Sequence, residues 1–506
     1  MVSGKACGMY LKKILLSDEM KIFLSLFFTY LLFAKYDGWN ENSRLDLAMS
    51  IVDHGTLSID SYHENTGDKA YHGGHYYSDK APGTGILLAP VYLLYANTLG
   101  KDMQDDRWFL RLVFFSIVFL SSLSSALCAA VLYRFLRFFT KNRMTKLAVT
   151  YTFGLATISF QYATVLLGHA VSTLLILLAY YLVYEKADNL FLSGVLAGLS
   201  FLVDYTNIGF VIALFIFIFL RSMKQLLPFS LGVMVFIAVF FAYNACAFGS
   251  PFNISYMYVF NGIPEDGNVT ATQMSLDTFI KPRFTDYWYS VPLRVLFYPY
   301  RGLFFYNPIL IRGMLYLISQ NSKLRLALVI SFVILMYIYM RYISGIWWGG
   351  TAFGPRYLLP LVPFLCLYLV YPFESQKSSI RILTAALIIL SFIFTLSGNQ
   401  RWEQTVLAVD GTNSFTDWYD SHLLRYDYQY RNMLPLENPL FSFYIPQLLY
   451  IGPSSILIEM IFDVSLSPWL NMAVCVLIFL VIWGADIKKG IMDYWTRKHK
   501  SQDNAA

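Results

Sequence analysis

The sequence predicts an all-α, polytopic membrane protein, and three observations lead to that fold class. Of 506 residues, 57% are hydrophobic and only 14% are charged, against roughly 25% charged in an average soluble domain. The mean hydropathy is +0.50. Apolar runs long enough to cross a hydrocarbon core of roughly 30 Å recur along the chain. A soluble domain builds one core and has no need of such repeated runs.

We expect about 12 membrane-spanning helices, because each isolated apolar run of about 17–22 residues is long enough to be a span. The predicted spans cover residues 20–35, 109–132, 147–166, 169–186, 190–204, 206–221, 226–246, 302–319, 324–342, 356–372, 380–397 and 467–485. The weakest are the short pair around Asp204 and the span interrupted by Pro308. No small-residue cleavage site follows the first run, so we interpret it as a retained span.

The basic residues provide an independent test of this threading. When the spans alternate from a cytoplasmic N-terminus, every basic cluster falls on one side, as the positive-inside bias requires. The clusters are Lys12 and Lys13; Arg134, Arg137, Lys141, Arg143 and Lys146; Arg221 and Lys224; Lys323 and Arg325; Lys377 and Arg381; and Lys488, Lys489, Arg497, Lys498 and Lys500. The net charge of +6 therefore reflects topology and requires no nucleic-acid partner.

Three segments on the opposite face are too polar to be spans, namely 36–108, 247–301 and 398–466. We accordingly divide the chain into a catalytic transmembrane module at 1–400, which includes the outer loop 36–108, an outer-loop region at 401–466, and a last span with its cytoplasmic tail at 467–506. The five cysteines show neither metal-ligand spacing nor a disulfide framework. These features predict a multi-pass protein of the plasma membrane.

The first outer loop contains a predicted surface helix. Asn42 or Ser43 is expected to cap it, and Gly55 to end it. Its apolar positions recur at helical spacing and are Leu45, Ala48, Ile51 and Val52. Such a short amphipathic helix is expected to lie on the membrane surface. Its N-terminal end then carries Glu41, Arg44 and Asp46.

A glycine-rich stretch later in the same loop has the composition of an anion site. Residues 73–85 are polar, contain Lys80, and open directly into the apolar run 86–99. A lysine beside the N–H groups of a helix N-terminus suits a phosphate. The stretch matches neither a Walker motif nor a dinucleotide-binding glycine pattern.

Residues 40–46 and 75–83 together resemble the first periplasmic loop of the GT-C membrane glycosyltransferases. The loop is most similar to the branch that holds protein O-mannosyltransferases and the lipid A aminoarabinose transferase. In that branch an acidic residue after the first span precedes an Arg by three positions, and a Lys-Pro-Pro-like turn opens a second loop helix. Here Glu41, Arg44 and Lys80-Ala81-Pro82-Gly83 occupy those places.

Later stretches continue the resemblance in the same order. They are Tyr162-Ala163-Thr164 with His169, Tyr243-Asn244 with Phe248-Gly249-Ser250-Pro251, and Trp347-Trp348-Gly349-Gly350 with Gly354-Pro355-Arg356-Tyr357. One departure concerns the acidic pair, which usually includes Asp and here is Asn40-Glu41. The identity of the catalytic carboxylate, Glu41 or Asp46, is therefore left open by the resemblance.

The resemblance implies transfer of a sugar from a polyprenyl phosphate to a glycan, lipid or protein acceptor on the periplasmic or extracellular face. We predict Glu41 as the general base, with Asp46 as the alternative, because an attacking hydroxyl must lose its proton. Cations that stabilise the departing phosphate are predicted to be Arg44, Lys80, Arg356 and Arg301. Substrate contacts are predicted for His75, Tyr77, His169 and Tyr357. The implied partners are the lipid-linked donor, an unknown acceptor and membrane lipid.

Other interpretations compete with this one. We assign no metal ligand, although His72, His75, Asp68 and Asp79 offer a set for a divalent cation in a loop that collects such residues by chance. A secondary transporter also has about 12 spans, but no internal repeat is found and the first outer loop is long. A protein that binds or flips a lipid-linked sugar without transferring it is the third alternative.

Overall fold

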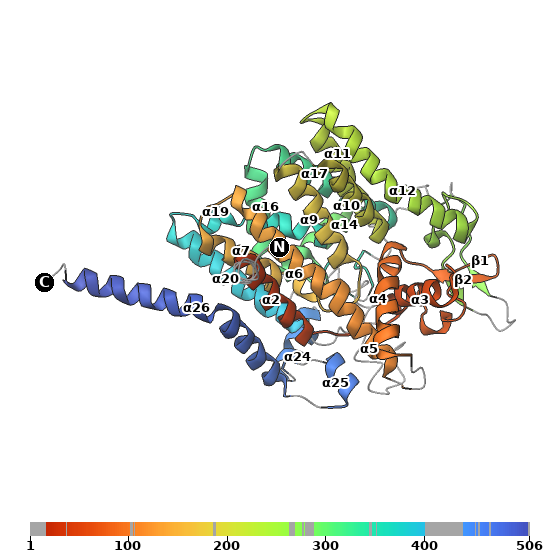
Figure 1. Ribbon diagram of the computed structural model, residues 1–506. Helices are drawn as coiled ribbons and strands as arrows, with labels where there is room; N and C mark the ends of the chain where they lie inside the picture. The colour runs from red at the N-terminus through yellow and green to blue at the C-terminus, as the bar shows by residue number, and fades with distance from the viewer. Residues whose placement is uncertain are drawn as a thin grey trace, which may run out of the picture.

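The computed structural model describes residues 17–503, apart from gaps at 37, 102–104, 106, 186–188, 263–268, 276–277, 279–287, 344–346, 351, 400–438, 451, 454–455 and 465–466. The described chain is mainly helical and carries two small antiparallel sheets (Figure 1). The predicted basic residues Lys12 and Lys13, and most of the predicted outer region 401–466, lie outside the described residues.

Six helices of the described chain are long and apolar enough to cross a membrane. They cover Trp108–Phe138, Met223–Phe248, Lys323–Tyr342, Arg356–Phe373, Ser378–Ser397 and Trp469–Asp493. The protein is therefore membrane-embedded and predominantly α-helical. Shorter apolar helices occupy further predicted spans, so the count of about 12 stays a prediction.

Most predicted spans coincide with helices. These are α2 (Asp18–Leu32), α9 (His169–Glu185), α10 (Leu190–Val203), α11 (Ile208–Phe219), α12 (Leu226–Phe248), α17 (Lys323–Tyr342) and α20 (Ser378–Ser397). The second span is built from α5 (Trp108–Ser116), the π-helical η2 (Ile117–Ser122) and α6 (Leu123–Phe135). The periodic apolar pattern thus locates these elements within a few residues.

Three predicted spans are interrupted. The third consists of α7 (Arg143–Leu155) and the short α8 (Ser159–Tyr162). The eighth consists of α15 (Leu303–Tyr306) and, after Pro308, α16 (Ile309–Ser319); helix α14 (Val291–Phe297) precedes it in the predicted outer segment. The tenth consists of η10 (Arg356–Leu361), α18 (Val362–Leu367) and α19 (Val370–Phe373). Proline explains the later breaks, since it removes a backbone donor and clashes with the preceding turn. The last helix, α26 (Pro468–Asp503), runs well past its predicted end, after α24 (Ile445–Tyr450) and α25 (Ile456–Phe462). It projects from the side of the molecule opposite the β1–β2 hairpin (Figure 1).

The surface helix is displaced and buried relative to its prediction. Helix α3 spans Trp39–His54 with Gly38 as its N-cap, so neither Asn42 nor Ser43 caps it; Gly55 does end it in the left-handed conformation. Every residue from Glu41 to Ser50 is buried. Its polar side chains between Glu41 and Ser50 are buried inside the protein as well. The prediction used only the apolar positions of the helix and therefore did not include this burial. The helix packs against α4 (Gly83–Leu99).

The glycine-rich stretch begins with a β-hairpin that we did not predict. Strands β1 (Lys69–His72) and β2 (His75–Ser78) pair antiparallel around Gly73-Gly74. Both glycines have positive φ, 61° and 89°, which is the requirement of a tight two-residue hairpin turn. The smaller sheet pairs β3 (Phe260–Gly262) with β4 (Thr270–Ala271), and β1 also bridges to the segment before β3.

Close backbone contacts bring the helix ends of the site together. A Cβ on Gly83 would lie 2.5 Å from the carbonyl carbon of Leu202, near the end of α10. A Cβ on Gly168 would lie 2.5 Å from Oγ1 of Thr84. Glycine at both positions lets the start of α4, the end of α10 and the start of α9 meet. The loop that carries Lys80 therefore lies beside the helix ends that carry His169 and Asp204.

Candidate functional site

Arg44 is a buried cation on α3. Its side chain is held by its own helix, since Nη1 donates to the Asn40 backbone oxygen at 2.8 Å and also to Asn40 Oδ1. Its Nε makes no hydrogen bond within the described part of the chain. Burial lowers the pKa of the Arg44 guanidinium, and the charged groups that it senses include Arg356, Asp79 and Asp204. The Nε–H group of Arg44 is thus a buried donor that a ligand could use.

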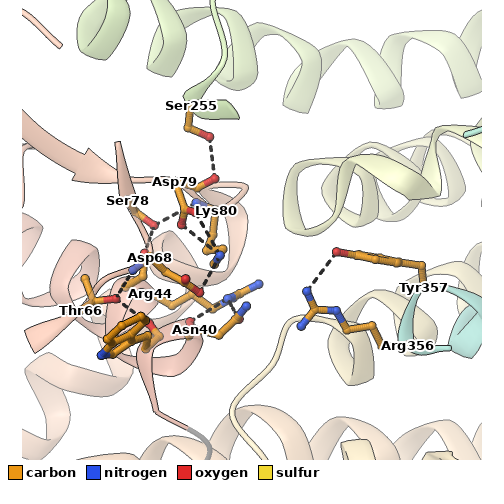
Figure 2. A network of polar contacts seen from close by, with 12 residues as sticks. Asn40, Arg44, Thr66, Asp68, Ser78, Asp79, Lys80, Ser255, Arg356 and Tyr357 are labelled. Atoms are coloured by element: carbon orange, nitrogen blue, oxygen red, sulfur yellow. Dashed lines mark hydrogen bonds and ion pairs between the residues drawn. The ribbon is translucent and has the colours of Figure 1, made fainter. Parts of the chain in front are cut away.

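Arg356 approaches the same point from a distant segment. It opens η10, and its Nη2 donates to the hydroxyl of Tyr357 at 3.0 Å. The Arg356 guanidinium also lies 5.0 Å from the centroid of the Tyr357 ring. Figure 2 shows Arg356 and Tyr357 facing the group that contains Arg44 and Lys80. Two arginines that converge at low exposure favour an anion, because guanidinium groups bind phosphate through paired hydrogen bonds.

Lys80 follows the hairpin and is already neutralised by carboxylates. Its Nζ lies 2.8 Å from Asp68 Oδ2 and 3.1 Å from Asp79 Oδ1 (Figure 2). The Asp79 backbone oxygen accepts a hydrogen bond from Ser255 Oγ at 2.9 Å, which ties this turn to the loop after α12. Burial raises the pKa of the Asp79 carboxyl, while the Lys80 cation opposes that shift. Lys80 reaches a phosphate only by leaving one of these carboxylates.

His169 and Asp204 form a buried pair at the ends of α9 and α10. His169 Nδ1 lies 2.9 Å from Asp204 Oδ2. Asp204 Oδ1 in turn accepts from the Thr206 amide at 3.0 Å and from its hydroxyl at 2.8 Å. The His169 ring meets the ring of Tyr357 edge-on, with 5.3 Å between centroids. We call Arg44, Arg356, Tyr357, His169 and Asp204 together the arginine centre.

The two predicted carboxylates on α3 lie deeper than we expected. Glu41 is fully buried in the first turn, where its Oε1 accepts from the Leu166 amide at 2.7 Å. Asp46 is also fully buried rather than on the helix surface, and its Oδ1 accepts from Asn65 Nδ2 at 3.0 Å. Burial raises the pKa of Asp46 to about 8. The expectation that Glu41 and Asp46 lie on a helix at the membrane surface is therefore corrected, while their catalytic roles stay predictions.

Three other predicted residues contact groups other than those of the arginine centre. His75 lies in the exposed hairpin turn and pairs with Asp60 at 2.7 Å. Tyr77 packs its ring on Phe248, with 5.2 Å between centroids. Arg301 is buried elsewhere and donates to the Tyr444 hydroxyl at 3.4 Å. Across the described ranges, no group of three His, Cys, Asp or Glu side chains is arranged to hold a metal ion.

The sequence analysis gave two residues near the arginine centre too little weight. Asp204 was named only as the position of a short pair of predicted spans, although an ionisable residue near a membrane boundary is a functional candidate by default. Tyr256, from the loop after α12, carried no signal, and it interacts electrostatically with Arg44, Asp204 and Tyr357. The importance of Asp204 follows from its contact with His169 in the structure, and the sequence spacing of the two residues does not reveal that contact.

Comparison with known proteins adds no identification. No protein-family model matches the chain, and no curated protein matches it in sequence. The functional argument therefore rests on the chemistry of the site. Two guanidinium groups, a histidine–carboxylate pair and a nearby lysine with its two carboxylates are suited to binding an anionic group beside a group that takes up a proton.

Proposed function

We propose that this protein is a membrane glycosyltransferase that moves a sugar from a polyprenyl-phosphate donor to an acceptor on the non-cytoplasmic face. The observation that carries the proposal is that buried Arg44 and half-buried Arg356 lie close enough to interact electrostatically. A lipid phosphate supplies the negative charge that such a pair favours. The apolar helices around it suit a polyprenyl tail.

The reaction follows from these residues. The acceptor oxygen forms a bond to the anomeric carbon, and the bond from that carbon to the phosphate oxygen breaks. The leaving polyprenyl phosphate keeps the electron pair, and Arg44 and Arg356 stabilise its charge. Lys80 adds a third cation when it exchanges a carboxylate for the phosphate. The acceptor proton passes to a base, for which the sequence predicts Glu41, with Asp46 as the alternative.

The test uses the purified protein in lipid nanodiscs with a panel of polyprenyl-phosphate-linked sugars. A cell-envelope extract serves as the source of acceptor, and the measurement is release of free polyprenyl phosphate with transfer of labelled sugar. We expect release by the wild type and strongly reduced release by the double variant Arg44→Gln, Arg356→Gln. Tight binding of polyprenyl phosphate without release would favour the lipid-linked-sugar binding or flipping protein instead. A protein that shows neither binding nor release would contradict the proposal and leave the transporter alternative.

A further inference from the structure

We propose that His169, oriented by Asp204, is the group that accepts the proton of the acceptor hydroxyl. This inference rests on the proposed glycosyl transfer and names a base for it that differs from the sequence-derived candidate. Asp204 is assigned here as a positioning residue, because it acts through His169.

A carboxylate lies against one nitrogen of the imidazole. Thr206 donates two hydrogen bonds, at 3.0 and 2.8 Å, to Asp204 Oδ1. The other oxygen, Oδ2, then lies 2.9 Å from His169 Nδ1. A neutral imidazole carries one proton, and a carboxylate beside Nδ1 keeps that proton on Nδ1. The lone pair is therefore on Nε2, which is the arrangement in which a histidine–carboxylate pair acts as a base.

The ring also lies where an acceptor must approach. His169 is the first residue of α9, and its ring meets Tyr357 and Tyr162 edge-on at 5.3 and 5.7 Å between centroids. Arg356 and Arg44 both act on His169 electrostatically. A phosphate held by these arginines consequently places the attached sugar near the imidazole. Within the described residues, Nε2 makes no hydrogen bond that competes with an acceptor hydroxyl.

The carboxylates near the centre are committed to other contacts. Glu41 accepts a hydrogen bond from the Leu166 amide at 2.7 Å. Because Leu166 lies three residues before His169, this contact of Glu41 fixes the turn that leads into α9. Asp46 has a pKa raised to about 8 and is largely protonated at neutral pH. Asp79 lies against the Lys80 ammonium. His169 is the remaining group at the centre with an orientation suited to proton uptake.

The proposed step balances without a further reagent. As the acceptor oxygen bonds to the anomeric carbon, its proton moves to His169 Nε2 and produces an imidazolium beside the Asp204 carboxylate. The bond between the anomeric carbon and the phosphate oxygen breaks, and its electron pair leaves with the polyprenyl phosphate. The imidazolium later returns the proton to water.

The experiment compares His169→Gln, Asp204→Asn and Asp204→Glu with a matched control, His54→Gln. His54 is an exposed histidine at the far end of α3. Two quantities are measured for each: turnover of the donor that the wild type uses, and affinity for polyprenyl phosphate. For His169→Gln we expect kcat to fall roughly 10²- to 10⁴-fold, the usual worth of a positioned base, with affinity within about threefold of wild type because the arginines are intact. Asp204→Asn should lower kcat and leave the affinity unchanged. Asp204→Glu should have a kcat between those of Asp204→Asn and the wild type. His54→Gln should match the wild type in both quantities.

Each other outcome has a defined meaning. If the wild type turns over a donor and His169→Gln turns it over with the same kcat, the proton-transfer role of His169 alone is overturned and the proposed function stands. A His169→Gln that loses phosphate affinity and kcat together assigns the residue to binding or folding and also overturns it. A wild type that turns over no polyprenyl-phosphate sugar overturns the proposed function, and this step with it.

Discussion

Two polar regions of the molecule hold buried or half-buried charges in opposite ways. In the first, the Asp18 network, Arg143 donates to both oxygens of Asp18 at 2.7 and 2.6 Å and to Asp486 at 2.8 Å, while Lys21 also pairs with Asp486. Two cations therefore meet two carboxylates. In the arginine centre, by contrast, two guanidinium groups lie near each other, and Asp204, one of the carboxylates close to Arg44, accepts from Thr206 and lies 2.9 Å from His169.

The difference separates a structural role from a binding role. The Asp18 network joins α2, α7 and α26, and Trp483 of α26 adds cation–π contacts to Lys21 and Arg143. Its charges are satisfied by one another, so it is suited to holding helices together. The arginine centre brings two guanidinium groups near each other, and the repulsion between these like charges costs free energy that a bound anion offsets. The predictions below test that contrast, beginning with the largest expected effect.

The first prediction is that the two regions face opposite sides of the membrane. In a background with Cys246→Ser, because Cys246 is exposed, Ser61→Cys should react with an impermeant thiol reagent in intact cells, whereas Ser378→Cys should not. Both serines are exposed in the folded protein. The reason is the positive-inside bias. Labelling at residue 378 with protection at residue 61 would invert the topology and separate the arginine centre from its donor. The further sites Asn268 and Asn413 lie outside the described residues.

The second prediction concerns phosphate affinity. Arg44→Gln and Arg356→Gln should each weaken polyprenyl-phosphate binding by roughly 10- to 150-fold, since a hydrogen bond to a charged group contributes about 1.5–3 kcal/mol. Arg44→Lys should also be impaired because an ammonium does not replace the planar guanidinium. Lys80→Ala should have a smaller effect, because Lys80 is already paired with Asp68 and Asp79. Unchanged affinity for polyprenyl phosphate in both arginine variants would show that Arg44 and Arg356 do not bind the phosphate.

The third prediction breaks the Asp18 network. Arg143→Gln leaves the Asp18 and Asp486 carboxylates without their shared partner, and should lower stability by about 1 kcal/mol because the pair is partly exposed and screened. The measurement is the melting temperature in detergent. Phosphate affinity should not change. The matched control is Arg325→Gln, because Arg325 is a half-exposed arginine that donates to the Ile318 backbone oxygen. A loss of affinity in Arg143→Gln would contradict the separation of structural and binding charges.

The fourth prediction distinguishes two roles for Glu41. If Glu41 mainly holds the Leu166 amide, Glu41→Gln keeps an acceptor oxygen and should cost less than about tenfold in turnover, whereas Glu41→Leu buries an unpaired amide and costs more. A loss of roughly 10²- to 10⁴-fold in Glu41→Gln, with phosphate affinity intact, would restore Glu41 as the general base.

These cases also show how far the sequence could lead. Apolar periodicity located most helices, because burial in a membrane leaves a strong pattern. Motif order brought Arg44, Arg356, His169 and Tyr357 to attention, and the structure places them together. The inward polar face of α3 and the His169–Asp204 pair could not be predicted, since they depend on long-range packing. The Gly73-Gly74 hairpin could have been recognised from two glycines between strand-forming residues.

The last prediction concerns Asp46, whose carboxyl is buried beside Asn65 and has no cation in hydrogen-bond range among the described residues. Its pKa is raised from 3.8 to about 8 by burial. Between those values the folded protein holds a proton that the unfolded chain releases, so stability from this residue falls as pH rises through that window. Asp46→Asn cannot ionise and should escape the loss. Its stability relative to wild type should grow with pH by up to about 1.4 kcal/mol per unit and level off above about pH 8.

Melting temperatures of both proteins in detergent, at intervals from about pH 5 to about pH 8.5, measure this difference. Turnover by Asp46→Asn should stay close to that of the wild type, because a carboxyl that is largely protonated at neutral pH is a poor base. Parallel melting curves would show that Asp46 is ionised in the folded protein. If Asp46→Asn also abolished transfer while Glu41→Gln and His169→Gln stayed active, the base would be Asp46, and the motif resemblance on α3 would have to be shifted along the helix.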